Sequence, residues 1–248
     1  MSGLEVRGFS AGYGRVEVLH ALDLKLDKGE IVTVIGPNGA GKSSLFNLIS
    51  GAIRPSAGTV RFDGQDVTAQ APNLLLGSGL SRSFQITNLF FELSVRENLR
   101  LAAQFLERGR GLFKLVQHSQ VSMQRVNELL SQFELAGKAG ELAGYLSHGE
   151  QRRLEIAVSM ASRPRMLLLD EPTQGMSHTD TRVTENLIRG LSRDHGLSIL
   201  LVEHDVDLVM QLSDHVVVMH QGQKLAEGTP TEVRANPAVQ AAYFGEKH

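Results

Sequence analysis

Residues 36–43 read GPNGAGKS, and this stretch decides the fold class of the 248-residue chain. It fits the pattern G-x-x-x-x-G-K-[ST] of phosphate-binding loops. Residues 30–35 before it form an apolar, β-branched run that is typical of a strand buried on both faces, and residues 43–50 after it favour a helix. The order of strand, glycine-rich turn and helix is the context that the pattern requires, so the stretch predicts a nucleotide site.

Each position of this loop has an expected task. The glycines let backbone N–H groups converge on phosphate oxygens, and the helix N-terminus adds its dipole. We expect Lys42 to bridge the β- and γ-phosphates, Ser43 to ligate Mg²⁺ and Ser44 to donate a further hydrogen bond. The predicted nucleotide-binding residues are Gly36, Pro37, Asn38, Gly39, Ala40, Gly41, Lys42, Ser43 and Ser44. A glycine-rich turn that only caps a helix is the alternative, and the strand–loop–helix context disfavours it.

A second polar site is predicted where residues 166–171, MLLLDE, end an apolar run in two carboxylates. Asp170, at the carboxyl end of the predicted strand, is placed to hold Mg²⁺ through water. Glu171 is the candidate general base for the attacking water. Taken alone, the run is equally compatible with a strand that ends in a polar turn before Pro172, but the phosphate loop makes that alternative weak.

Strand and helix signals along the chain predict an α/β fold. Strands are expected at residues 4–9, 18–26, 30–35, 59–62, 80–84, 166–170, 198–202 and 215–219. Helix-spaced apolar residues recur instead at 95–106, 121–133 and 150–161, with a loop at 107–114. We therefore predict a P-loop NTPase core with a mostly parallel sheet between helices, an N-terminal antiparallel β region and an inserted helical subdomain. The whole chain, 1–248, would be a single domain with core 1–88 and 163–248 and a helical subdomain at about 89–162.

Composition narrows the function classes. The net charge of −2 gives no electrostatic indication of nucleic-acid binding, and the absence of cysteine excludes disulfides and thiolate metal sites. No apolar run approaches the roughly 20 residues that span a bilayer. A role at a membrane would therefore depend on a partner.

Residues 146–153, LSHGEQRR, resemble the signature motif of ABC ATPases, commonly L-S-G-G-Q. Other positions follow the order of that family. Tyr13 resembles the aromatic platform for adenine, Gln85 the loop glutamine that senses Mg²⁺ and the membrane subunit, and His204 the switch histidine that contacts the γ-phosphate. The alternatives are a turn aromatic, a surface glutamine and an ordinary surface or core histidine.

The resemblance implies a role for the signature in a second copy of the site. Ser147 and Glu150 form S-x-x-E, a capping box that would begin a helix at this point. In the family, Ser147, Gly149 and Glu150 would meet ATP bound to another subunit. With one phosphate loop and one signature per chain, two complete sites need a homodimer or heterodimer.

Two positions depart from the family pattern. His148 replaces the first signature glycine, which makes the backbone path near phosphate less certain. Ser177 stands where family members often carry aspartate, so a carboxylate contact across the dimer is in doubt there.

Three stretches resemble the ATPases of branched-chain amino acid and urea importers: residues 147–150, 202–210 and 227–246. The resemblance implies an ATPase at the cytoplasmic face of the inner or plasma membrane, bound peripherally to integral permease subunits and served indirectly by a solute-binding protein. The ATPase of a lipopolysaccharide exporter has a similar ending and is one alternative. A non-transport ABC ATPase or another P-loop enzyme, such as a kinase, is a further alternative, which the absence of a long coiled-coil insertion and the presence of the signature disfavour.

Phe90, Phe91 and Leu93 follow Gln85 in the segment where the family docks its membrane partner. An exposed apolar patch at this place would mark an interface. The alternative is that these side chains fill the core of the helical subdomain.

Overall fold

The computed structural model describes residues 2–13, 16–83, 89–107 and 120–244. In these residues the strands form two sheets. The smaller sheet is antiparallel and has the order β2-β1-β4-β5. Its strands are β1 (Ser2–Tyr13), β2 (Val16–Asp27), β4 (Ala57–Phe62) and β5 (Gln65–Asp66). The predicted N-terminal antiparallel region is therefore confirmed.

The larger sheet carries the predicted nucleotide site. Its order is β10-β9-β3-β8-β7-β6, with parallel pairing from β9 to β6 and an antiparallel β10 at one edge. Its strands are β3 (Ile31–Ile35), β6 (Leu80–Arg82), β7 (Met166–Asp170), β8 (Ser198–Val202), β9 (His215–His220) and β10 (Gln223–Gly228). Because β3, β7 and β8 are neighbours and parallel, their carboxyl ends meet at one edge of the sheet.

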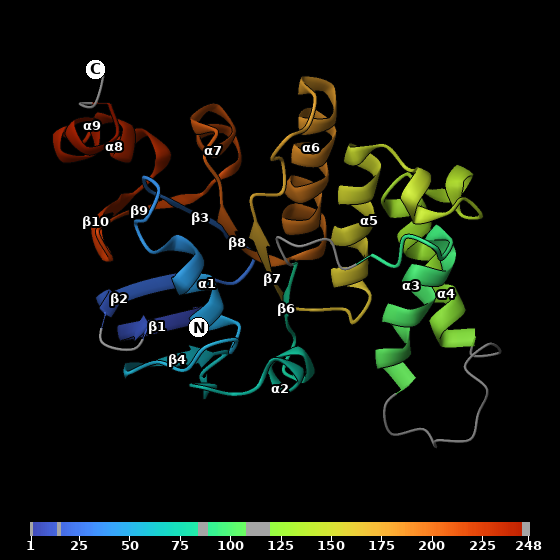
Figure 1. The fold of residues 1–248 in the computed structure, drawn as a ribbon, viewed down its shortest axis with the longest axis horizontal. Helices are drawn as coiled ribbons and strands as arrows, with labels where there is room; N and C mark the ends of the chain where they lie inside the picture. Colours follow the sequence, from blue (N-terminus) through green and yellow to red (C-terminus); the bar gives the residue numbers. More distant parts are fainter. Residues whose placement is uncertain (1, 14–15, 84–88, 108–119, 245–248) are drawn as a thin grey trace.

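Helices cover this sheet and extend beyond it (Figure 1). Between β6 and β7 the described residues contribute helices and no strand of either sheet, and Figure 1 shows these helices grouped to one side of the molecule. The α-helices are α1 (Lys42–Ile49), α2 (Pro72–Gly77), α3 (Val95–Ala103), α4 (Gln120–Gln132), α5 (His148–Met160), α6 (His178–His195), α7 (Val206–Leu212), α8 (Pro230–Ala235) and α9 (Pro237–Phe244).

The fold class predicted from the sequence is confirmed by this arrangement. The expected helices at 43–50, 95–106, 121–133 and 150–161 correspond to α1, α3, α4 and α5, with ends that differ by at most three residues. Most of the loop predicted at 107–114 lies outside the described residues. Of the helices described, none has both the length and the apolar character of a membrane span.

Strand β7 is apolar from Met166 to Leu169 because it is buried on both faces. Met166 and Leu168 pack in the core between the larger sheet and the antiparallel sheet, whereas Leu167 and Leu169 pack in the core that the helices form on the other face. All four side chains are fully buried. Burying each such side chain contributes about 1.5–3 kcal/mol to folding. This two-sided packing fixes the level at which β7 ends, and so where Asp170 lies.

Candidate active site

The loop between β3 and α1 is shaped by glycines that tolerate no side chain. A Cβ added to Gly36 would lie 2.4 Å from the carbonyl oxygen of Met219. Gly41, the N-cap of α1, has a left-handed φ of 98°, and its added Cβ would lie 2.7 Å from Leu19. These contacts hold the loop tightly against β9 and β2, while Asn38 remains exposed at its tip.

Lys42 lies inside this loop and is 7% exposed. Its Nζ donates to the carbonyl oxygens of Gly36 at 2.7 Å and Pro37 at 3.1 Å. Burial lowers the pKa of Lys42, and the negative charges of Glu171 and Asp170 act in the opposite direction. The ammonium is thus held by neutral carbonyls next to two carboxylates, an arrangement that suits a group that binds phosphate.

Asp170 ends β7 and is 1% exposed. Its Oδ2 accepts a hydrogen bond from Nη2 of Arg82 at 3.4 Å, whereas its buried Oδ1 has no hydrogen-bond partner. Burial raises the pKa of Asp170, the Arg82 guanidinium lowers it and Glu171 raises it. A buried carboxylate oxygen without a partner is costly, and a cation would satisfy it.

The donor set for Mg²⁺ can be assessed from two of its three predicted members. Asp170 offers Oδ1, the oxygen without a hydrogen-bond partner, and Ser43 is an exposed residue in the first turn of α1. Mg²⁺ is commonly bound by one or two protein oxygens together with water and substrate phosphates, so these residues fit that ion. Gln85, the third predicted member, lies outside the described residues.

Glu171 and His204 meet at the carboxyl ends of neighbouring strands. Oε1 of Glu171 lies 2.5 Å from Nε2 of His204. The backbone N–H of Glu171 also donates to the carbonyl of Val202 at 2.9 Å, which extends the pairing of β7 with β8 by one residue. Glu171 has a left-handed φ of 47°, which is uncommon for a residue with a side chain. The structure therefore places the predicted base and the predicted switch histidine in direct contact.

The signature segment begins α5 with the capping box expected from the sequence. Oγ of Ser147 accepts from the N–H of Glu150, and a Glu150 oxygen accepts from the N–H of Ser147. Burial raises the pKa of Glu150, but the N–H of Ser147 and the Lys138 ammonium outweigh it, so the pKa is lowered. Gly149 is buried, and a Cβ there would lie 2.7 Å from an oxygen of Asp180.

The signature lies apart from the phosphate loop of the same chain. Figure 1 shows α1 and α5 on opposite sides of β7 and β8. Ser177, where family members often have aspartate, caps α6, and its hydroxyl donates to Oδ2 of Asp180 at 2.6 Å. A carboxylate thus occurs three residues later, beside Gly149. His148 is exposed, and Tyr13 ends β1 with its side chain outside the described residues.

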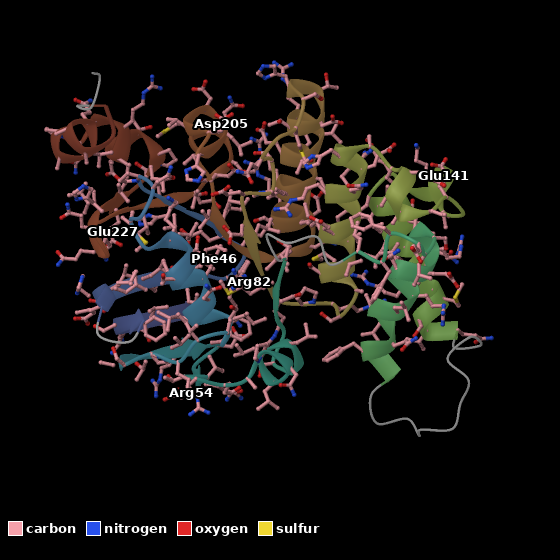
Figure 2. All side chains as sticks on the ribbon, in the orientation of Figure 1. Phe46, Arg54, Arg82, Glu141, Asp205 and Glu227 are labelled. Atoms are coloured by element: carbon pink, nitrogen blue, oxygen red, sulfur yellow. The ribbon has the colours of Figure 1, made fainter. Side chains whose placement is uncertain are left out.

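Sequence reasoning missed Arg82, whose side chain is 8% exposed and connects the phosphate-loop helix to Asp170. Nη1 of Arg82 donates to Oδ1 of Asn47 at 2.7 Å and to Oγ of Ser50 at 2.8 Å, and both acceptors follow the loop in the chain. Figure 2 shows Arg82 beside Phe46, whose ring centroid lies 5.8 Å from its guanidinium carbon. An arginine within a strand otherwise expected to be buried was the available signal.

Two more buried charged residues were not predicted from the sequence, and both contact the turn after β7. Arg152 of α5 donates to the carbonyl of Asp170 at 2.6 Å. Glu203, 3% exposed, accepts from the hydroxyl of Thr173 at 2.6 Å. A carboxylate directly after an apolar strand was a weak signal for Glu203, and only the fold shows what it binds.

Comparison with known proteins identifies the class that this fold and site define. The family model described as "ABC transporter" matches residues 19–174, more than half of the chain, so the chain belongs to the ABC transporter ATP-binding family. A second model, described as "Branched-chain amino acid ATP-binding cassette transporter", matches residues 223–248. The predicted ABC ATPase is thereby confirmed, as is its resemblance to the branched-chain amino acid group.

Relatives and solved structures of ATP-binding cassettes match this chain over nearly its full length. The high-affinity branched-chain amino acid transport ATP-binding protein BraF of Pseudomonas aeruginosa is 39% identical over 98% of each chain, and LivG of Escherichia coli strain K12 is 38% identical over 98% of each. A nucleotide-free ATP-binding cassette from an ABC transporter superposes with a TM-score of 0.87 at 28% identity, covering 99% of this chain and 100% of that chain. The ADP conformation of an ATP-binding cassette gives 0.86 at 29% identity, with the same coverage.

Proposed function

We propose that this chain is the ATP-hydrolysing subunit of an importer of branched-chain amino acids or of a related small amide such as urea. The observation that carries the proposal is the match of residues 223–248 to the branched-chain model, because that segment lies outside the part of the chain matched by the general ABC model. The names of BraF and LivG support the same cargo.

ATP binding is assigned to the loop between β3 and α1. The backbone N–H groups of residues 36–44 surround the phosphates, and Lys42 exchanges its carbonyl partners for phosphate oxygens. Ser43 and Asp170, with Gln85, would hold Mg²⁺, and the ion would neutralise the charge that develops on the phosphates. Tyr13 stacks on the adenine.

Hydrolysis is assigned to Glu171 and His204. Glu171 accepts the proton of the attacking water, and His204, in contact with its carboxylate, orients toward the γ-phosphate. The carboxylate is largely shielded from solvent whereas the imidazole is exposed, with side-chain exposures of 11% and 42%. The histidine side of the pair is therefore accessible to ATP and to a partner subunit.

The working unit we propose is a dimer with its membrane partners. Ser147, Gly149 and Glu150 of one copy close over ATP held by a second copy or a related subunit, because the signature and the phosphate loop lie apart in one chain (Figure 1). Residues 89–162 act as the helical subdomain and 1–88 with 163–248 as the core. The assembly works at the cytoplasmic face of the membrane on integral permease subunits, and a solute-binding protein delivers the cargo.

The docking face for the permease includes Phe90 and Phe91, which are 60% and 44% exposed. The alternative that these rings fill the helical core is wrong, although Leu93 is half-buried. Large exposed aromatic side chains on neighbouring residues are typical of an interface.

Uptake by the reconstituted transporter tests the proposal. The chain is assembled with its permease subunits in proteoliposomes that contain ATP, the solute-binding protein is added outside, and uptake of radiolabelled leucine, urea and lysine is compared. ATP-dependent uptake of leucine or urea, with lysine excluded, is the expected result. Uptake of neither leucine nor urea by an assembly that hydrolyses ATP would contradict the cargo assignment.

A further inference from the structure

The turn that carries Glu171 is held on one side by a single guanidinium. Nη2 of Arg152 donates to the carbonyl oxygens of Asp170 at 2.6 Å and Glu171 at 3.1 Å, and Nε donates to that of Pro172 at 3.2 Å. Arg152 is itself paired with Glu155 at 2.6 Å. Three successive carbonyl groups of the turn are therefore fixed to helix α5.

The other side of the turn is held by Glu203. Its Oε1 accepts from the backbone N–H of Thr173 at 3.1 Å and from the Thr173 hydroxyl at 2.6 Å. Its Oε2 accepts from the backbone N–H of His204 at 3.1 Å. One carboxylate oxygen is thus bound to the turn after β7, and the other to the backbone of the switch histidine.

Burying the carboxylate of Glu203 in this space costs free energy. The residue is 3% exposed, and none of the ion pairs found among the described residues includes it. A buried carboxylate is disfavoured unless hydrogen bonds replace its water, and here three N–H or O–H donors do so. An apolar side chain would avoid that cost but could not join the two turns.

We propose that Glu203 is a positioning residue for hydrolysis: through Thr173 and the backbone of His204, its carboxylate sets Glu171 and His204 at the separation that the reaction needs. Its carboxylate acts through these contacts and takes no part in the chemical step itself. Arg152 holds the same turn from the side of α5. Glu171 therefore lies between the contacts of Arg152 and those of Glu203, in its left-handed conformation. The inference rests on the proposed ATPase function.

Two substitutions weaken the connection with little change of shape. Thr173→Val keeps the size of the side chain and removes the hydroxyl donor, leaving only the backbone N–H of residue 173 to donate to Glu203. Glu203→Gln places an amide group where two sets of donors converge. Each should lower kcat about 10- to 100-fold, the effect of small misplacements of catalytic groups, with KM for ATP unchanged. Thr173→Ser keeps the hydroxyl and should retain wild-type kcat. The double variant Glu203→Gln/Thr173→Val should be no slower than Glu203→Gln alone.

A matched control is available in Thr184. This threonine is 1% exposed and donates to the sulfur of Met176 at 3.6 Å. Thr184→Val makes the same chemical change in a buried threonine that does not contact Glu203, so its kcat should equal that of the wild type. All variants are measured in the assembled transporter, with melting temperature and ATP affinity alongside.

Several results would overturn the inference. Wild-type kcat in both Thr173→Val and Glu203→Gln would show that the connection is not needed. A loss of kcat in Thr173→Ser equal to that in Thr173→Val, or a loss that merely follows a lower melting temperature and weaker ATP binding, would show a structural role only. An inactive wild type in the complete assembly would instead contradict the proposed ATPase function, and the inference with it.

Discussion

Glu171→Gln should convert an ATP-driven cycle into an ATP-locked dimer. Glutamine has nearly the size of glutamate and can keep a hydrogen bond to His204, which lies 2.5 Å from the present carboxylate. It cannot accept the proton of the attacking water. It also removes one negative charge from a site that must hold a triphosphate, so closure becomes easier while hydrolysis slows.

The expected magnitude follows from the role of the carboxylate. Loss of a general base lowers kcat by about 10²- to 10⁴-fold, or about 3–5 kcal/mol in the activation barrier. The Glu171 charge also contributes to raising the pKa of Asp170, so the substitution should lower that pKa.

Size-exclusion chromatography measures the dimer directly. With ATP the Glu171→Gln variant should elute as a dimer and with ADP as a monomer, in low salt and without Mg²⁺ if residual turnover interferes. Ser147→Arg in the same background is the control. It places a large side chain at the exposed cap of α5, so it should abolish the shift and leave ATP binding to the monomer.

Two results would refute this reasoning. If Glu171→Gln hydrolyses ATP at the wild-type rate, Glu171 is not the base. If the variant is inactive yet stays monomeric with ATP, even with the membrane subunits supplied, the two-subunit mechanism is wrong for this protein.

Four further changes test separate parts of the site. Lys42→Ala should weaken nucleotide binding and lower turnover at least about 100-fold, since a buried charged donor to phosphate is lost; unchanged turnover of the purified protein would exclude the nucleotide site. His204→Ala should leave the ATP affinity measured by titration intact and lower kcat about 100-fold, and a normal kcat in the assembled transporter would remove it from the site. Ser147→Ala should cost about 1 kcal/mol of stability in urea unfolding through the lost helix cap, and an unchanged midpoint would show that the cap is dispensable. Phe90→Ser with Phe91→Ser should prevent co-purification with the permease at an unchanged melting temperature, because both rings are exposed; a lower melting temperature would show a role in folding instead.

Local sequence was sufficient for the phosphate loop, the apolar strands and the capping box. Each leaves its pattern in a short stretch of chain: closely spaced glycines at 36 and 41, an unbroken apolar run in β7, and a serine three residues before a glutamate. The pattern is readable even where the selecting contact is distant, as with Met219 against Gly36, because the residue types themselves are adjacent in the sequence. The α/β class followed from their order.

The tertiary structure alone decided how the catalytic turn is supported. Arg82 meets Asp170 across 88 residues, Arg152 meets the same residue across 18, and Glu203 meets Thr173 across 30. No periodic pattern in the sequence predicts a contact between such positions. The pairing of β6, β7 and β8 and the packing of α5 beside them bring each pair together. A single charged residue next to an apolar run has the same local sequence whether it faces solvent or binds a buried turn, and only the folded backbone distinguishes the two.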